Sequence, residues 1–379
     1  MNKFSLDISF EKFLDENYEK RFYLSRSSVD VANITWSKLD AALFSWPADD
    51  GTLILYDGGR ISIDDYTEKY LDVAALKTRV VKDIFYNYIE KGATLVLNKL
   101  NGHMPEISDM CRQVSKQLGV KCNANGYVAF GGSGSFGRHW DTHDVFAIQV
   151  IGKKRWRIYT PTFEKPLAHQ NSKKDLHSCP TDPVLEVVLE PGDVLYLPRG
   201  WWHEAVPIPG EESFHISVGL FPPKIIDYLL WTAGNKMTNY LEGRHALRSE
   251  GGNKQSIAEF VERLQREMLG HDNLSDFFES VNFSQRDQSR FHLGRIFGKK
   301  DESISEPGKV SVLSPVSSIC KDAVVVNGVR IKLDGKTVQL LTSILKHYEG
   351  ESWAEDFVVN GADAETLKLL MRLDVVDVF

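Results

Sequence analysis

Residues 138–159 read RHWDTHDVFAIQVIGKKRWRIY, and residues 191–206 read PGDVLYLPRGWWHEAV. The first stretch carries a run of apolar and aromatic residues that is typical of β-strands, preceded by polar side chains at alternate positions. In an extended strand, alternate side chains face the same side. We therefore predict that His139 and Asp141 point together. The second stretch predicts a strand, a tight turn and another strand, which together place His203.

The surrounding residues 120–220 are rich in short β-type runs. VKCNANGYVAF, EVVLEPGDVLYLP and FHISVGLF are separated by glycine and proline turns. Many short strands at this spacing predict a sandwich or barrel. Helices are predicted at residues 9–20 and 105–119, the second with Pro105 at its start and Gly119 just past its end. The class is α+β, with core strands at about 90–220.

The C-terminal part has a different character. Residues 224–300 show helical periodicity, and the polar residues 301–311 predict a linker. The Asn327–Gly328 pair predicts a hairpin, and helices are predicted at 338–348 and 362–374, with a last strand at 375–379. These elements suggest a winged-helix-like module. We expect domains at 1–221, 222–305 and 306–379.

Composition limits the class of protein. The chain has 379 residues, a net charge of −7, 42% hydrophobic residues and 26% charged residues, as expected of a globular protein. The four cysteines form no C-x-x-C pair, which favours a reducing compartment, and we expect the cytoplasm. The chain contains no run of about 18 apolar residues, so no membrane span is predicted. Residues 306–379 carry 8 Lys and Arg against 11 Asp and Glu, so we do not expect direct DNA binding.

Two histidines and one carboxylate are typical ligands for one face of Fe(II), with the opposite positions left open. His139, Asp141 and His203 supply this set. An alternative pairs Asp141 with His143, which shares its face in a strand; we favour a position for His143 beside the site. In the PGD turn, Asp193 is predicted to bond local backbone.

The spacing H-x-D-x-x-D-x-F-x-x-Q-x-x-G-x-K-x-W, followed by PGD-x-LY-x-P-x-G-x-x-H, resembles the JmjC-type cupin ribosomal oxygenases. That family includes a bacterial arginine hydroxylase of a ribosomal protein and nucleolar histidine hydroxylases. The opening FEKFLDENYEKR is also similar to the family. The resemblance implies a double-stranded β-helix (the JmjC/cupin jelly roll), then a helical dimerisation region and a C-terminal winged-helix-like module.

The resemblance also implies site residues. His139, Asp141 and His203 match the catalytic iron ligands, and Lys154 matches the basic residue that pairs with the distal carboxylate of 2-oxoglutarate. Lys153 or Arg155 remains an alternative, because in a strand these two face away from Lys154.

Asn125 and Ser217 match positions near the co-substrate, and Tyr127 is a candidate to line the same pocket. Each has a structural alternative, namely a turn residue before a glycine, a strand filler and a core tyrosine. Arg138 and His143 match no defining family position, so they are candidates for shaping substrate preference.

The function implied is that of an Fe(II)- and 2-oxoglutarate-dependent oxygenase, which would hydroxylate a protein side chain and release succinate and CO2. A ribosomal protein is the expected substrate, and a homodimer the expected assembly. The same chemistry on another peptide, or as a demethylase, is the first alternative. The second is a non-catalytic metal-binding cupin, which would have no need of a buried cation such as Lys154.

Overall fold

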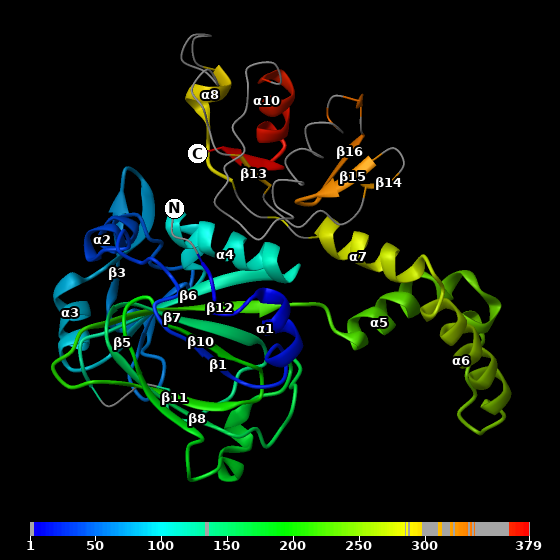
Figure 1. Ribbon diagram of the computed structural model, residues 1–379, viewed down its shortest axis with the longest axis horizontal. Coiled ribbons are helices and arrows are strands. Elements are labelled where there is room, and N and C mark those ends of the chain that lie inside the picture. Colours follow the sequence, from blue (N-terminus) through cyan, green and yellow to red (C-terminus); the bar gives the residue numbers. More distant parts are fainter. Residues whose placement is uncertain are drawn as a thin grey trace. The chain divides into compact units, whose positions relative to one another are not determined.

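The computed structural model describes residues 4–132, 136–284, 286, 289–297, 310–312, 319–320, 323–332, 334–335, 337 and 364–378. The chain divides into two compact units, residues 1–221 and residues 222–379 (Figure 1). The predicted three-part division at 221 and 305 stays a prediction. Among the described residues, no helix is long and apolar enough to cross a membrane.

The first unit consists of two antiparallel sheets with helices. Its larger sheet has, in spatial order, β1 (Tyr23–Ser25), β10 (Val194–Leu197), β7 (Asp144–Gly152), β12 (Ser213–Phe221), β6 (Lys121–Ala129), β5 (Thr94–Leu97) and β2 (Leu53–Tyr56). The smaller sheet has β11 (Trp202–Pro207), β8 (Lys154–Tyr159) and β9 (Leu185–Leu189). A separate hairpin pairs β3 (Thr67–Asp72) with β4 (Ala75–Val80). The helices are α1 (Phe10–Glu16), α2 (Trp36–Phe44), α3 (Lys82–Glu90) and α4 (Pro105–Leu118).

Residues 145–151 (VFAIQVI) of strand β7 are almost continuously apolar because of where the strand packs. Phe146 and Ile148 belong to a core shared with α1 and α4, whereas Val145 and Ala147 pack with residues of the smaller sheet. Both faces of β7 are therefore buried, so alternation of polar and apolar residues is absent. The space between the two sheets is where the site residues gather.

The predicted β-rich block at 120–220 is confirmed as β6 to β12, and helix α4 ends at Leu118 with Gly119 in the left-handed conformation, as predicted. The larger sheet extends further toward the N-terminus than the predicted core at 90–220. Strands β1 and β2 form its two edges. Their partners are distant in sequence, so local periodicity could not assign them to this sheet.

Gly152 ends β7, where the chain turns toward β8. Its φ is 63°, and a Cβ there would lie 1.8 Å from the carbonyl oxygen of Glu212. We expect Gly152→Ala to destabilise the fold by about 2–4 kcal/mol, because the backbone must shift as well as adopt a strained φ. Denaturation midpoints measure the loss. Gly58, with φ 61° and open space, is the matched control; an equal loss in Gly58→Ala would rule out the close contact as the cause.

The second unit combines helices with small sheets. The helices are α5 (Ile225–Asn235), α6 (Lys254–Met268), α7 (Asn273–Ser284), α8 (Leu293–Phe297) and α10 (Ala364–Arg372). The strands are β13 (Val310–Val312), β14 (Ile319–Cys320), β15 (Ala323–Val326), β16 (Val329–Lys332) and β17 (Val376–Val378). The hairpin around Asn327–Gly328 is confirmed as β15–β16. The predicted helix at 338–348 and most of the predicted linker at 301–311 lie outside the described residues.

Candidate metal centre

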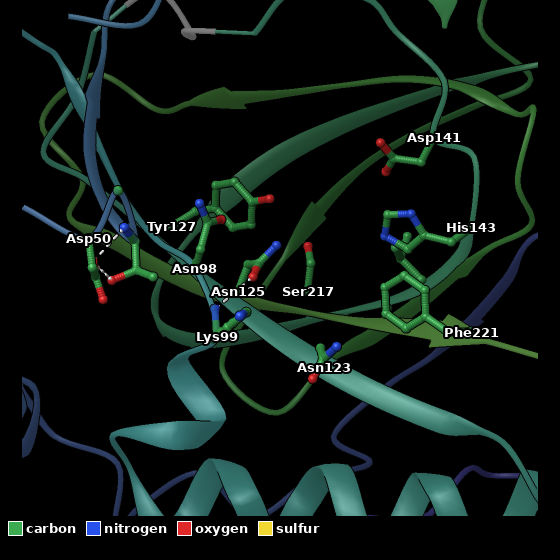
Figure 2. A pocket seen from close by; sticks show the side chains of 14 residues that line it. Asp50, Asn98, Lys99, Asn123, Asn125, Tyr127, Asp141, His143, Ser217 and Phe221 are labelled. Carbon is green, nitrogen blue, oxygen red and sulfur yellow. Dashed lines mark hydrogen bonds between the residues drawn. The ribbon is translucent and has the colours of Figure 1, made fainter. Parts of the chain in front are cut away.

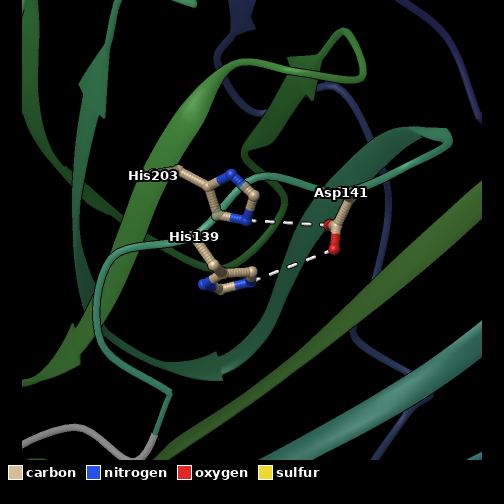
Figure 3. Close-up of side chains that lie close together, drawn as sticks. All are labelled: His139, Asp141 and His203. Carbon is tan, nitrogen blue, oxygen red and sulfur yellow. Dashed lines mark ion pairs between the residues drawn. The ribbon is translucent and has the colours of Figure 1, made fainter. Parts of the chain in front are cut away.

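The structure brings His139, Asp141 and His203 together (Figure 3). One ligand atom from each lies within 4.8 Å of the others. The two carboxylate oxygens of Asp141 lie 4.0 Å from Nε2 of His139 and 3.7 Å from Nε2 of His203. These are spacings that one metal ion can bridge.

The two histidines are held side by side by the backbone. The amide of His139 donates to the carbonyl of His203 at 3.0 Å, and the amide of His203 donates back at 2.8 Å. His203 lies at the start of β11. Contrary to the prediction, His139 and Asp141 are not in a strand: β7 begins at Asp144, and His139 forms an isolated bridge before it. The pairing with His203, rather than strand alternation, sets their orientation.

Backbone carbonyls fix the tautomer of both imidazoles. Nδ1 of His139 lies 3.0 Å from the carbonyl of Gly137, and Nδ1 of His203 lies 3.0 Å from the carbonyl of Trp201. A carbonyl only accepts, so each Nδ1 must carry the proton and donate it. Each Nε2 is thus left with its lone pair directed toward Asp141, which is the arrangement of a metal-binding histidine.

The electrostatics favour the same protonation states. Burial, and then the like charge that His139 carries when it is protonated, lower the pKa of His203 to about 4, so the His203 imidazole is neutral near pH 7. Burial acts to raise the pKa of Asp141, but the neighbouring imidazoles of His203, His139 and His143 outweigh it and hold that pKa below its ordinary value. A neutral imidazole and an ionised carboxylate are the forms that bind metal. The donor set therefore fits a divalent ion.

His143 lies apart from this group. Its ring stacks on Phe221, with centroids 4.9 Å apart and planes 21° from parallel, and it fills the space above Gly219. It lines a cavity of about 490 Å³ that also reaches Asp141. Figure 2 shows Asp141 and His143 on one side of this cavity and Asp50 on the other. The structure therefore brings His139, and not His143, together with Asp141 and His203.

Lys154 faces the space between the sheets and is only 3% exposed. The alternatives face outward: Lys153 pairs with Glu190 at 2.7 Å, and Arg155 pairs with Glu186 at 3.6 Å. Within the described part of the chain, Lys154 has no hydrogen bond or ion pair. Burial lowers its pKa to about 8. A buried ammonium without an anion is costly, so this position suits a negatively charged ligand.

Asn125, Tyr127 and Ser217 lie on neighbouring strands and line the cavity. Asn125 and Ser217 are directly opposite each other in the β6–β12 register. The Oδ1 atom of Asn125 accepts from the amide of Lys99 at 3.0 Å. The three residues are thus gathered on one wall beside Asp141. Asp193, as predicted, accepts from the amide of Glu190 in its own turn.

His215 was not predicted as a site residue from the sequence. This residue is 3% exposed, stacks on Tyr127 with ring centroids 4.8 Å apart, and meets Trp156 edge-on at 5.4 Å. Its Nδ1 is buried without a hydrogen-bond partner among the described residues. Burial, and then the nearby charge of Lys154, lowers its pKa. Its place two residues before Ser217 on the same strand face was the signal available in FHISVG.

Comparison with known proteins places a JmjC domain at residues 99–228. A bifunctional lysine-specific demethylase and histidyl-hydroxylase NO66 of Drosophila persimilis is 31% identical over 144 residues, covering 38% of this chain and 20% of that protein. Ribosomal oxygenase 1 of Gallus gallus is 30% identical over 185 residues, covering 48% of this chain and 31% of that protein. The chain thus spans about a fifth to a third of these relatives.

Solved structures of Escherichia coli YcfD share the fold. One aligns over 100% of both chains with a TM-score of 0.60 and 16% identity. Another, described as the ribosomal oxygenase YcfD in complex with cobalt and 2-oxoglutarate, aligns over 99% of both chains with a TM-score of 0.59 and 15% identity. The first unit therefore has the JmjC/cupin fold, with mixed sheets and helices.

Proposed function

We propose that this JmjC-domain protein is an Fe(II)- and 2-oxoglutarate-dependent oxygenase that hydroxylates a protein side chain. The observation that carries the proposal is the convergence of two imidazole Nε2 atoms and one carboxylate, with both tautomers fixed by backbone carbonyls. Two histidines and one carboxylate suit Fe(II) with open positions for a co-substrate and dioxygen. The resemblance to proteins named ribosomal oxygenases supports the same reading.

In this proposal His139, Asp141 and His203 hold the metal. When bound, Fe(II) with 2-oxoglutarate and dioxygen supplies the oxidant for a C–H bond, and 2-oxoglutarate leaves as succinate and CO2. The protein's own contribution is positioning. No side chain is required to act as a general base.

Lys154 would bind the distal carboxylate of 2-oxoglutarate. Its buried ammonium has no anion among the described residues, and His215 adds an unpartnered nitrogen close by. Asn125, Tyr127 and Ser217 line the adjoining wall. This arrangement argues against a metal-binding cupin without catalysis, because such a protein has no use for a buried cation that lacks an anion.

The cavity beside Asp141 would receive the substrate. Most of the residues that line it are polar, and its volume of about 490 Å³ leaves room for one side chain of a protein. The relatives' names support a ribosomal protein as substrate. Demethylation is the second candidate, favoured by the name of the NO66 relatives; both reactions use the same site.

Succinate formation tests the proposal. With Fe(II), 2-oxoglutarate and oxygen, the purified protein is expected to release succinate slowly in the absence of a substrate. Release should be faster when peptides from ribosomal proteins are added. Mass spectrometry should then find a gain of one oxygen atom on one peptide. A loss of a methyl group would favour demethylation. No succinate with any peptide pool would contradict the oxygenase proposal.

Residues 222–305 are proposed to form a homodimer interface. Apolar side chains on two helices are exposed: Ile225 is 83% and Leu230 61% exposed on α5, and Ile257 is 48% and Val261 53% exposed on α6. Exposed apolar groups of this kind are typical of protein–protein interfaces.

The winged-helix-like module at 306–379, without direct DNA binding, remains a proposal. The four widely spaced cysteines, which form no C-x-x-C pair, support a reducing compartment such as the cytoplasm.

Leu230→Asp is expected to convert a dimer into monomers, because a carboxylate would be buried in an apolar interface. Sedimentation or light scattering would show a halved mass with an unchanged circular dichroism spectrum. Glu262→Ala, on the exposed surface of α6, is the matched control and should leave the mass unchanged. A wild-type protein that is already monomeric at the concentrations tested would refute the interface.

A further inference from the structure

Behind the metal ligands, on the opposite face of β11, lies the carboxylate of Glu204. It directly follows His203, so the two side chains point to opposite sides of the smaller sheet. Its side chain is 15% exposed. The oxygen Oε1 accepts from the Tyr159 hydroxyl at 2.8 Å and from Nη1 of Arg157 at 3.3 Å, and lies 3.7 Å from Nε of Arg138.

Arg138 directly precedes the other histidine ligand, His139. Its guanidinium lies over the ring of Tyr159, 4.6 Å from the centroid, and Nη1 donates to the carbonyl of Pro180 at 3.3 Å. Together with Glu204, these contacts hold Arg138 from three directions. Burial, with the hydrogen bond to Glu204, raises the pKa of Tyr159 to about 12, so this hydroxyl remains a donor at neutral pH.

The segment that carries His139 and the segment that carries His203 are thus joined by two sets of contacts, one between backbones and one between side chains. In the middle, the reciprocal backbone hydrogen bonds of 3.0 and 2.8 Å join His139 to His203. On the outer side, Nε of Arg138 lies 3.7 Å from Oε1 of Glu204, and both side chains contact Tyr159. On the inner side, the imidazoles of His139 and His203 face Asp141.

We infer that Arg138, Glu204 and Tyr159 form a positioning clamp that sets the spacing of His139 from His203. The inference rests on the metal site proposed above. A metal site needs its ligands held within about 0.5 Å of the productive geometry by supporting contacts. Loss of such a contact typically weakens metal binding by about 10–100-fold. The clamp residues lie outside the group of His139, Asp141 and His203 and act through the ligands that they hold.

Glu204→Gln tests the clamp, since it keeps the size of the side chain and an acceptor for Tyr159 but removes the charge that attracts the two arginines. We expect Co(II) affinity to fall about 10-fold, and the visible spectrum of bound Co(II) to change because the ligands are less well fixed. Arg138→Met provides a second variant at a partly exposed position. If the two residues act as one unit, the double variant should lose little more than either single variant.

Glu186→Gln is the matched control. Glu186 lies on the neighbouring strand β9 and pairs with Arg155 and Arg157 on the same outer face, away from the ligands. Its Co(II) affinity and spectrum should equal those of the wild type. Wild-type affinity and spectrum in both Glu204→Gln and Arg138→Met would overturn the clamp while leaving the metal site intact. A wild-type protein that fails to bind Co(II) would instead overturn the proposed function and the clamp with it.

Discussion

Asp141→Ala is expected to lower the affinity for Fe(II) or Co(II) by more than about 100-fold, since loss of an outer contact alone costs about 10–100-fold. Asp141 supplies the charged ligand, and each of its oxygens faces one histidine Nε2. Without it, two neutral imidazoles remain, and they cannot offset the charge of a divalent ion. Succinate formation should fall to background. Calorimetry or the Co(II) spectrum measures binding, and a coupled assay measures succinate.

His143→Ala is the control that makes this result specific. His143 is the nearest other imidazole in sequence, but it packs on Phe221 outside the triad. Its removal should leave Co(II) affinity within about 3-fold of the wild type, a change below 1 kcal/mol. If His143→Ala lost metal as completely as His139→Ala, the triad proposed here would be wrong, and the alternative pair of Asp141 with His143 would be supported.

Lys154→Met is expected to weaken 2-oxoglutarate binding by about 100-fold, which corresponds to about 3 kcal/mol for a buried charge-assisted contact. Co(II) affinity should be unchanged, because Lys154 is not among the metal ligands. The separation of the two effects distinguishes an anchor for the co-substrate from a general structural role. Titration of the Co(II)-loaded protein with 2-oxoglutarate measures the loss.

Although Lys154→Met should weaken 2-oxoglutarate binding, it should stabilise the ligand-free protein at neutral pH. Burial lowers the pKa of Lys154 from 10.5 to about 8, so the unfolded chain binds more protons between these values. Stability therefore rises with pH from about 8 to 10.5 in the wild type. Lys154→Met removes the buried charge, so the variant should be more stable than the wild type at pH 7. The difference in their free energies of unfolding should narrow above pH 8.

Lys153→Met is the control for both measurements. Lys153 is half-exposed and pairs with Glu190 on the outer side of the sheet. The Lys153→Met variant should bind 2-oxoglutarate with the affinity of the wild type. Equal losses in the Lys153 and Lys154 variants would mean that basic charge near the site, and not a buried anchor, attracts the co-substrate.

Local features of the sequence were enough for several elements. Pro105 and Gly119 marked the ends of α4, because proline suits the first turn and glycine tolerates the left-handed conformation that ends a helix. Asn327–Gly328 marked a hairpin for a similar reason. These predictions succeeded because the physical cause lies within a few residues of the chain.

The site needed more than local pattern. Three polar residues at alternate positions, His139, Asp141 and His143, are equivalent if the chain is simply extended. The structure distinguishes them because residues 139–143 precede β7 and because the backbone of His139 pairs with that of His203. That pairing joins residues 64 positions apart, so no local periodicity could reveal it.

The sequence by itself determined the residue types of the site, the spacing H-x-D with a distant histidine, and the strand-rich character of residues 120–220. Only the tertiary structure decided that Lys154 faces inward while Lys153 and Arg155 form ion pairs outside. It also revealed that His215 is buried and that its Nδ1 has no hydrogen-bond partner among the described residues. The reason is that burial and unsatisfied hydrogen bonding depend on which face of a strand meets the second sheet, and that is settled by packing between distant segments.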